Sequence, residues 1–204
     1  MKSRLLCAVL SLLLLLAVSG CTANSVSALE DGTLPLEEFQ SEDGVFEYEK
    51  LPIGLSKGEA VQRLGLEMED LGNPMKLDSY ETYTLPEEKW VSYGDWEAVP
   101  MLEFNSGEIE MVHFRFTQYH GESDGVAAVD ELAEKLTQDL EARYGTCTVI
   151  ENELEGATST VYNWESDAEG QHTILRFSQV YSENTNYVLN LAMGLFEIPE
   201  TAQE

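Results

Sequence analysis

Residues 101–116 read MLEFNSGEIEMVHFRF, and this stretch carries the clearest structural signal in the chain. Two apolar runs flank an Asn-Ser-Gly turn, in which the glycine is free to take a positive φ. The returning strand alternates between an apolar and a polar face, in the order Val112, His113, Phe114, Arg115 and Phe116. This pattern predicts a β-hairpin in a sheet with one buried side.

Two helices are predicted on either side of this hairpin. Residues 56–59 read SKGE, a capping box, and Gly65 stands where a left-handed C-cap belongs, so we expect a short helix over about 57–64. A second helix over 126–144, ended by Gly145, follows from apolar residues at helical spacing. Its apolar face consists of Val129, Leu132, Leu136, Leu140 and Tyr144.

Further strands are expected before and after the second helix. They cover 80–84, 89–93, 158–164, 173–177 and 187–193, with a polar hairpin loop at 165–170. The order is helix, strands, helix, strands, so the sequence predicts an α+β fold of two helix-then-antiparallel-strands units. Each helix would pack on one face of an antiparallel sheet. The halves, 45–120 and 121–196, are candidates for distant repeats, although they share no residue-level identity beyond a helix ended by glycine.

The amino terminus has the layout of a secretion signal. Lys2 and Arg4 precede an apolar run over 5–18, which is shorter than the roughly 20 residues that span a bilayer. Residues 18–21 read VSGC, which resembles the lipobox of bacterial lipoproteins. The resemblance implies removal of a signal peptide over 1–20 and lipidation of Cys21 with fatty-acyl chains such as palmitate. An ordinary cleaved signal with a chance cysteine and a retained anchor remain the alternatives.

This amino terminus also predicts a location and a division of the chain. The mature protein would be lipid-anchored through Cys21 on the extracytoplasmic face of the cell membrane, since two or three acyl chains hold a protein firmly. Residues 21–44 have little periodic pattern and are expected to form a flexible acidic tether. A domain over 45–196 and a disordered tail over 197–204 would follow.

The charge of the mature chain narrows its partners. Nine Lys and Arg against all 38 Asp and Glu lie beyond Cys21, which gives a formal charge of −29. Nucleic acid and anionic lipid surfaces need a basic patch, so we expect no nucleic-acid partner. The acidity fits a soluble body, a basic partner, or weak condensation of cations. Beyond Cys21 the only cysteine is Cys147, either a small buried hydrophobe or a reactive thiol, so an apolar core must supply the stability.

Residues 51–65 read LPIGLSKGEAVQRLG. They resemble the opening of the repeat shared by β-lactamase inhibitor protein and the small outer-membrane assembly lipoproteins, in which an apolar-Gly-apolar-Ser/Thr start leads through an acidic residue and valine to Leu-Gly. The resemblance implies a protein-binding module with a concave sheet face and no catalysis. The long second helix and the strong acidity depart from that family.

Sites for chemistry were sought and none was found in the sequence. The histidines His113, His120 and His172 have no ligand-like spacing, and no acidic run matches a calcium loop. The chain lacks a Gly-x-Ser-x-Gly elbow and a phosphate-binding glycine loop. A pair of carboxylates for glycoside hydrolysis cannot be identified from the sequence, because Asp and Glu occur throughout the chain. We therefore expect that the chain is not an enzyme and that it holds neither a metal ion nor a cofactor.

The aromatic residues of 80–96 are the remaining candidates for partner binding: Tyr80, Tyr83, Trp90, Tyr93 and Trp96. Tyrosine and tryptophan are enriched at binding hot spots, but they also pack sheets against helices, and both readings stay open. The sequence predicts a non-catalytic lipoprotein that binds a protein or another envelope component through a sheet face. The alternative is an extracytoplasmic sensor that binds a small ligand in a pocket between helix and sheet.

Overall fold

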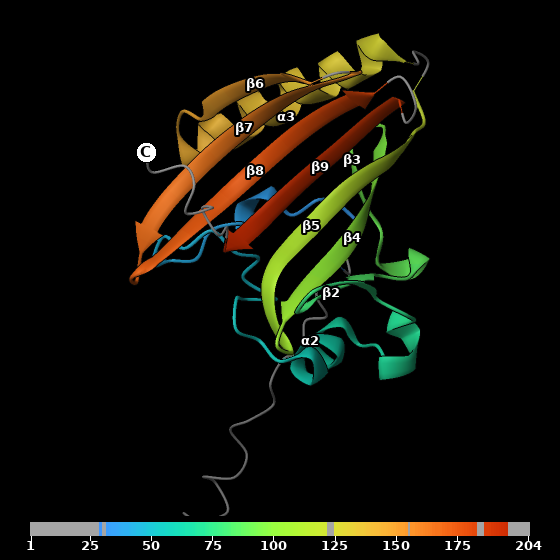
Figure 1. Cartoon of the computed structure of the whole chain (residues 1–204), viewed down its shortest axis with the longest axis vertical. Coiled ribbons are helices and arrows are strands. Elements are labelled where there is room, and N and C mark those ends of the chain that lie inside the picture. Colours follow the sequence, from blue (N-terminus) through green and yellow to red (C-terminus); the bar gives the residue numbers. More distant parts are fainter. Residues whose placement is uncertain (1–28, 30–31, 122–124, 155, 183–185, 196–204) are drawn as a thin grey trace, which may run out of the picture.

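The computed structural model describes residue 29 and residues 32–121, 125–154, 156–182 and 186–195 (Figure 1). The expected signal peptide over 1–20, the expected lipidation site Cys21, the start of the expected tether and the expected tail over 197–204 lie outside the described residues.

The described strands form one antiparallel sheet of nine strands. The order across it is β1-β2-β4-β5-β9-β8-β7-β6, with β3 also paired to β4. The strands are β1 (Met75–Leu77), β2 (Tyr80–Thr84), β3 (Val91–Tyr93), β4 (Trp96–Asn105), β5 (Glu108–Tyr119), β6 (Thr148–Leu154), β7 (Ala157–Ala168), β8 (Gln171–Ser182) and β9 (Asn186–Leu195).

Two α-helices lie among the described residues, α2 (Lys57–Leu64) and α3 (Val126–Tyr144), together with the short 3₁₀ turns η1 (Leu36–Glu38), η2 (Met68–Leu71) and η3 (Glu87–Lys89). The predicted bounds of α2 are confirmed. Ser56 and Glu59 form both bonds of the capping box, and Gly65 ends the helix with a φ of +67°. A positive φ is open to glycine because it has no Cβ.

The predicted fold class is wrong. The two runs of strands are parts of one sheet, because β5 pairs along much of its length with β9, from Met111 opposite Gly194 to Phe116 opposite Leu189. The two helices also do not begin two equivalent helix-then-strands units. The short α2 is held at the turn of the β4–β5 hairpin, where the amide of Lys57 donates to the carbonyl of Gly107. Strand pairing between distant segments has no local signal, so the pattern of elements could not reveal it.

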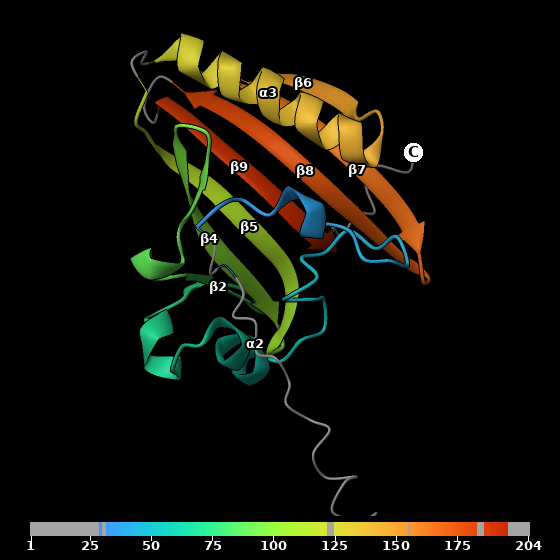
Figure 2. The same cartoon turned by 180° about the vertical axis from the view of Figure 1, so that it is seen from behind.

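One face of the sheet is covered, and the apolar core lies there (Figure 2). Along this face run α3 and the segment that contains η1. The sheet contributes large side chains with no exposed surface, among them Phe104, Phe114 and Phe177, and α3 adds Leu136 and Leu140. Burying such a side chain gains roughly 1.5–3 kcal/mol, so this face stabilises the fold.

The expected tether is wrong for its second half. Leu34, Leu36 and Phe39 are buried in the core, and the hydroxyl of Tyr144 on α3 donates to the carbonyl of Leu36. The folded part therefore begins before Val45. These apolar residues stand among acids and a glycine without helical or strand periodicity, so they resembled a linker in the sequence. The expected loop over 165–170 is also wrong, since β7 and β8 continue until only Glu169 and Gly170 remain as the turn.

The opposite face of the sheet has no helix over it among the described residues (Figure 1). We call it the open face. It carries the residues of each strand that alternate with the core side chains, such as Val99 and Met101 on β4 and Arg115 on β5. The candidate site lies on this face.

Candidate functional site

The middle of the open face is free of acidic side chains. Strand pairing aligns its residues in rows that run across the sheet. The first row is Val99, Arg115, Asn190, Ser178, Val161 and Ile150; the second is Met101, His113, Ala192, Arg176, Asn163 and Thr148; the third, shorter, is Val188, Val180, Ser159 and Asn152. Acids border these rows on both sides: Glu97 lies two residues before Val99 on β4, and Glu103 and Glu165 lie at opposite ends of the next row. In a chain with 38 Asp and Glu, this neutral to basic surface is distinct from the rest.

A groove of about 510 Å³ opens at the β4–β5–β9 part of this face. Its walls present apolar and polar surface in nearly equal parts, and Arg115 is the only charged residue that lines it among the described residues. The lining consists of Thr84, Trp90, Val99, Met101, Arg115, Phe116, Thr117, Tyr187 and Val188. The groove thus combines an apolar and aromatic surface with a single cation.

Arg115 is exposed and has no acidic partner among the described residues. Its neighbours in the row, Val99 and Asn190, are neutral. Other cations of the chain do find carboxylates: Lys50 contacts Glu38 at 2.8 Å. The guanidinium of Arg115 is therefore available to an external anion, and its planar fork matches a carboxylate in two hydrogen bonds.

His113 is two residues from Arg115 on the same face. Burial lowers the pKa of His113 to about 4, so the ring is neutral near pH 7. Its Nε2 lies 3.8 Å from Glu103 and its Nδ1 lies 3.3 Å from the side-chain amide of Asn190. Burial also raises the pKa of Glu103. The positive charge of the open face at neutral pH consequently comes from the arginines.

Arg176 is the second arginine of the open face, and it differs from Arg115 in its burial and in its hydrogen bonding. It is half-buried, and its Nε donates to Oδ1 of Asn163 at 2.9 Å, one strand away. This bond holds Arg176 against the sheet, whereas Arg115 stands in the groove.

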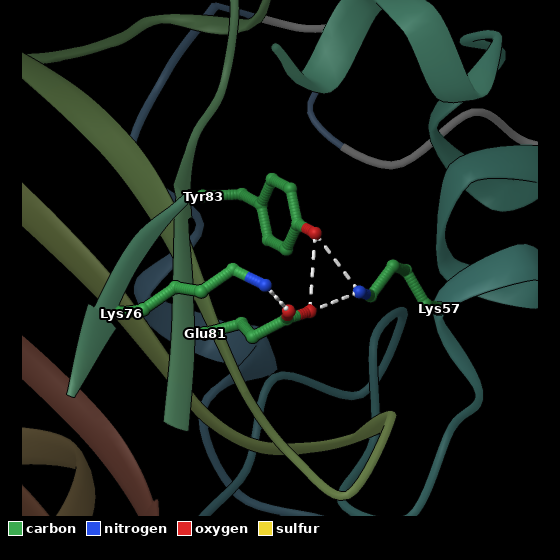
Figure 3. A network of polar contacts seen from close by, with 4 residues as sticks. All are labelled: Lys57, Lys76, Glu81 and Tyr83. Carbon is green, nitrogen blue, oxygen red and sulfur yellow. Dashed lines mark hydrogen bonds and ion pairs between the residues drawn. The ribbon is translucent and has the colours of Figure 1, made fainter. Parts of the chain in front are cut away.

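The predicted aromatic residues are not one surface. Tyr83 is in the core, edge-on to Phe104 at 5.8 Å between ring centres. Its hydroxyl accepts from Lys57 at 2.9 Å and donates to Glu81 at 3.1 Å (Figure 3). Glu81 also pairs with Lys57 and, at 2.6 Å, with Lys76. The two lysines lower the pKa of Glu81 to about 2, so this network fixes α2 to β2.

Tyr93 and Trp96 lie beneath α3. The hydroxyl of Tyr93 donates to Asp139 at 2.5 Å, and Lys135 lies 4.4 Å from the centre of the tyrosine ring. Burial and the bond to Asp139 raise the pKa of Tyr93. Trp96 lies 5.0 Å from Tyr119 between ring centres. Together with Leu132 these aromatic side chains line a small hollow of about 150 Å³.

Trp90 reaches the open face and Tyr80 lies half-buried on β2. The indole of Trp90 donates to the carbonyl of Leu85 at 3.2 Å, which fixes the ring at the groove. A further hollow of about 350 Å³ has both Trp90 and Trp96 in its lining, next to His120. Of the five predicted residues, only Trp90 therefore lines the groove on the open face.

The sequence reading missed most of the groove. Arg115 was placed on the polar face of its strand, but Tyr187 and Val188 come from β9, which only the β5–β9 pairing brings alongside. The absence of acids from these rows depends on the register of six strands. No single stretch of sequence contains that signal.

No group of three or more His, Cys, Asp or Glu that could hold a metal ion occurs among the described residues. Cys147 is half-buried, and burial together with Glu141, 3.5 Å from its sulfur, raises the pKa of its thiol. A raised pKa makes the thiol less reactive. No helix among the described residues is long and apolar enough to cross a membrane.

Comparisons with protein-family models, with curated proteins and with solved structures return no match for this chain. The resemblances noted in residues 18–21 and 51–65 stay predictions.

Proposed function

We propose that this chain is a non-catalytic lipoprotein, anchored through Cys21 on the extracytoplasmic side of the cell membrane. Its domain binds a protein or another envelope component through the open face of the sheet. The lipobox-like residues 18–21 support the anchor. An uncovered sheet face supports the binding, because such a face offers a broad surface that the fold itself does not need.

The observation that carries the proposal is the groove beside Trp90. A surface that serves solubility alone has no need of a partly apolar hollow of about 510 Å³, least of all on a chain of this acidity. Trp90 stands at its wall with its indole held by a hydrogen bond to the carbonyl of Leu85, and tryptophan is among the residues that dominate the energy of protein interfaces.

The alternative, a sensor with a small-ligand pocket between helix and sheet, is less well supported. The hollow between α3 and the β3–β4 turn measures about 150 Å³, and another of about 400 Å³ between α3 and the strands β7 and β8 lies open to solvent, whereas a small-ligand site buries most of its ligand. Pockets for metabolite-sized ligands usually measure about 300–1,000 Å³. The groove on the open face is larger but shallow and open along the sheet, as expected for a macromolecular partner.

Site-specific photocrosslinking in intact cells tests the binding face. A photoreactive residue replaces Thr117, which is exposed in the groove, and in a matched control it replaces Gln138, which is exposed on α3. We expect a discrete crosslinked species of higher mass from position 117 and none from position 138. Equal crosslinking at both positions, or none at either, would contradict the proposed face.

The anchor is tested by fractionation of cells that express the full chain or its Cys21→Ala variant. The unchanged chain should sediment with membranes and partition into detergent, because its acyl chains insert in the bilayer. The variant should lose this partitioning. A variant that stays as firmly bound as the unchanged chain would show that Cys21 carries no anchor.

A further inference from the structure

We infer that the groove recognises a peptide segment of the partner that carries an isolated carboxylate next to an apolar side chain. The inference deepens the proposed function and rests on it. The carboxylate would pair with Arg115, and the apolar side chain would pack against Trp90, Met101 and Val188.

Charge complementarity identifies the anion. Arg115 has no acidic partner among the described residues, and no Asp or Glu lines the groove. The rows that extend from the groove across β9, β8 and β7 are free of acids as well. A carboxylate in the groove meets the guanidinium of Arg115, and the nearest acids of the face, Glu97 and Glu103, lie outside the groove lining.

The same charges limit how acidic the bound segment is. The mature chain carries a formal charge of −29, so its long-range field repels a polyanion. A single guanidinium in the groove balances one negative charge, and the other arginine of the face, Arg176, is already bound to Asn163. A lone carboxylate in an apolar or basic stretch fits both the local and the overall charge. A phosphate, with up to two charges, fits less well.

The walls of the groove explain the apolar neighbour. Trp90, Met101 and Val188 present partly exposed apolar surface around the arginine. The indole is fixed by its bond to the carbonyl of Leu85, so it offers contact area without losing freedom on binding. Open ends along the sheet let a chain enter and leave, which favours a peptide segment over an enclosed small molecule.

Peptide binding to the full mature chain tests the inference. The probes are a short acetylated and amidated peptide that contains one phenylalanine and one glutamate, and the same peptide with glutamine in place of glutamate. Binding is followed by NMR through the indole signal of Trp90 and the guanidinium signal of Arg115. At low salt we expect the glutamate peptide to bind about three to ten times more tightly, as an exposed charge-assisted pair allows.

Two matched variants locate the effect. In Arg115→Gln the preference for glutamate should disappear, whereas Arg176→Gln should keep it, because Arg176 lies outside the groove lining. Equal binding of the two peptides to the unchanged chain would overturn the inference, as would a preference that survives in Arg115→Gln. Displacement of the glutamate peptide by inorganic phosphate at lower concentration than by acetate would also overturn it, since the site would then be a phosphate site.

The outcomes separate this inference from the proposed function. If position 117 crosslinks to a partner but the two peptides bind equally, the proposed binding face stands and the inferred carboxylate ligand is wrong. If the glutamate peptide binds more tightly but no crosslinked species forms in cells, the groove binds carboxylates and the proposed cellular partner at this face is wrong.

Discussion

On β5, Phe114 is buried on the covered side of the sheet, where its ring lies against Phe39 and Tyr48 of the N-terminal segment, whereas the adjacent Arg115 reaches solvent on the open side. The covered side is apolar because the fold requires a core. The open side is not simply polar: its middle rows lack acids and contain valine, methionine and arginine. Since stability does not demand this composition, the difference between the two faces points to the open one as the functional surface.

The largest expected effect is a difference in the free energy of unfolding between substitutions at two adjacent residues of β5, one on each face of the sheet. Phe114→Ala should lower the free energy of unfolding by about 3–5 kcal/mol, because the ring is fully buried and its loss leaves a cavity. Arg115→Ala should lower it by less than about 1 kcal/mol, since its side chain is exposed and has no ion pair among the described residues. Urea unfolding followed by circular dichroism measures both. Similar costs at the two positions would mean that the open face is structural.

An effect of intermediate size is expected in the pH dependence of stability, and it tests whether His113 on the open face is buried. Folded His113 takes up a proton only near pH 4, but in the unfolded chain it does so near 6.5. Its pKa is depressed on folding, so acidification from pH 7 favours the unfolded state, which binds the proton first. We expect His113→Gln to remove a loss of about 2 kcal/mol between pH 7 and pH 5.

The measurement is urea unfolding of both chains at pH 7 and pH 5. Glu47 and Glu103, whose pKa values are raised by burial, act in the opposite direction, but they are present in both chains. The difference between the two chains therefore reports the loss of His113 together with any change that this loss causes in Glu103, which lies 3.8 Å from its Nε2. A difference that does not change with pH would show that the ring is solvated.

The smallest effect lies away from both faces. Gly58→Ala in α2 meets no atom within 4 Å and replaces a glycine without a positive φ. It should raise the free energy of unfolding by about 0.5–1 kcal/mol, because alanine loses less backbone entropy in a helix. Peptide binding in the groove should stay unchanged. A change in binding would show that α2 is coupled to the open face, which would weaken the separation drawn here.

The elements that the sequence predicted well are those with local causes. The capping box of Ser56 and Glu59 and the terminal Gly65 set the bounds of α2, and alternation with an Asn-Ser-Gly turn set the β4–β5 hairpin. Such signals act within a few residues, where hydrogen bonding and backbone freedom decide the conformation.

The elements that were missed depend on distant partners. Leu34, Leu36 and Phe39 look like a linker until α3 and the sheet provide the core that they fill. The single sheet depends on β9 pairing with β5, and the groove on side chains from both of these strands. For the aromatic residues, the sequence offered a single candidate surface, but Tyr83 lies in the core, Tyr93 and Trp96 lie beneath α3, and only Trp90 lines the groove on the open face.

The placement of β9 has a consequence for the order of assembly. This strand is the last in sequence among the described residues, yet it lies between β5 and β8 in the interior of the sheet. A nascent chain that has not yet released residues 186–195 has two long strands, β5 and β8, each without its neighbour. Unpaired strand edges are templates for pairing with other chains. The polypeptide is therefore exposed to aggregation until residues 186–195 have left the ribosome and paired with both strands.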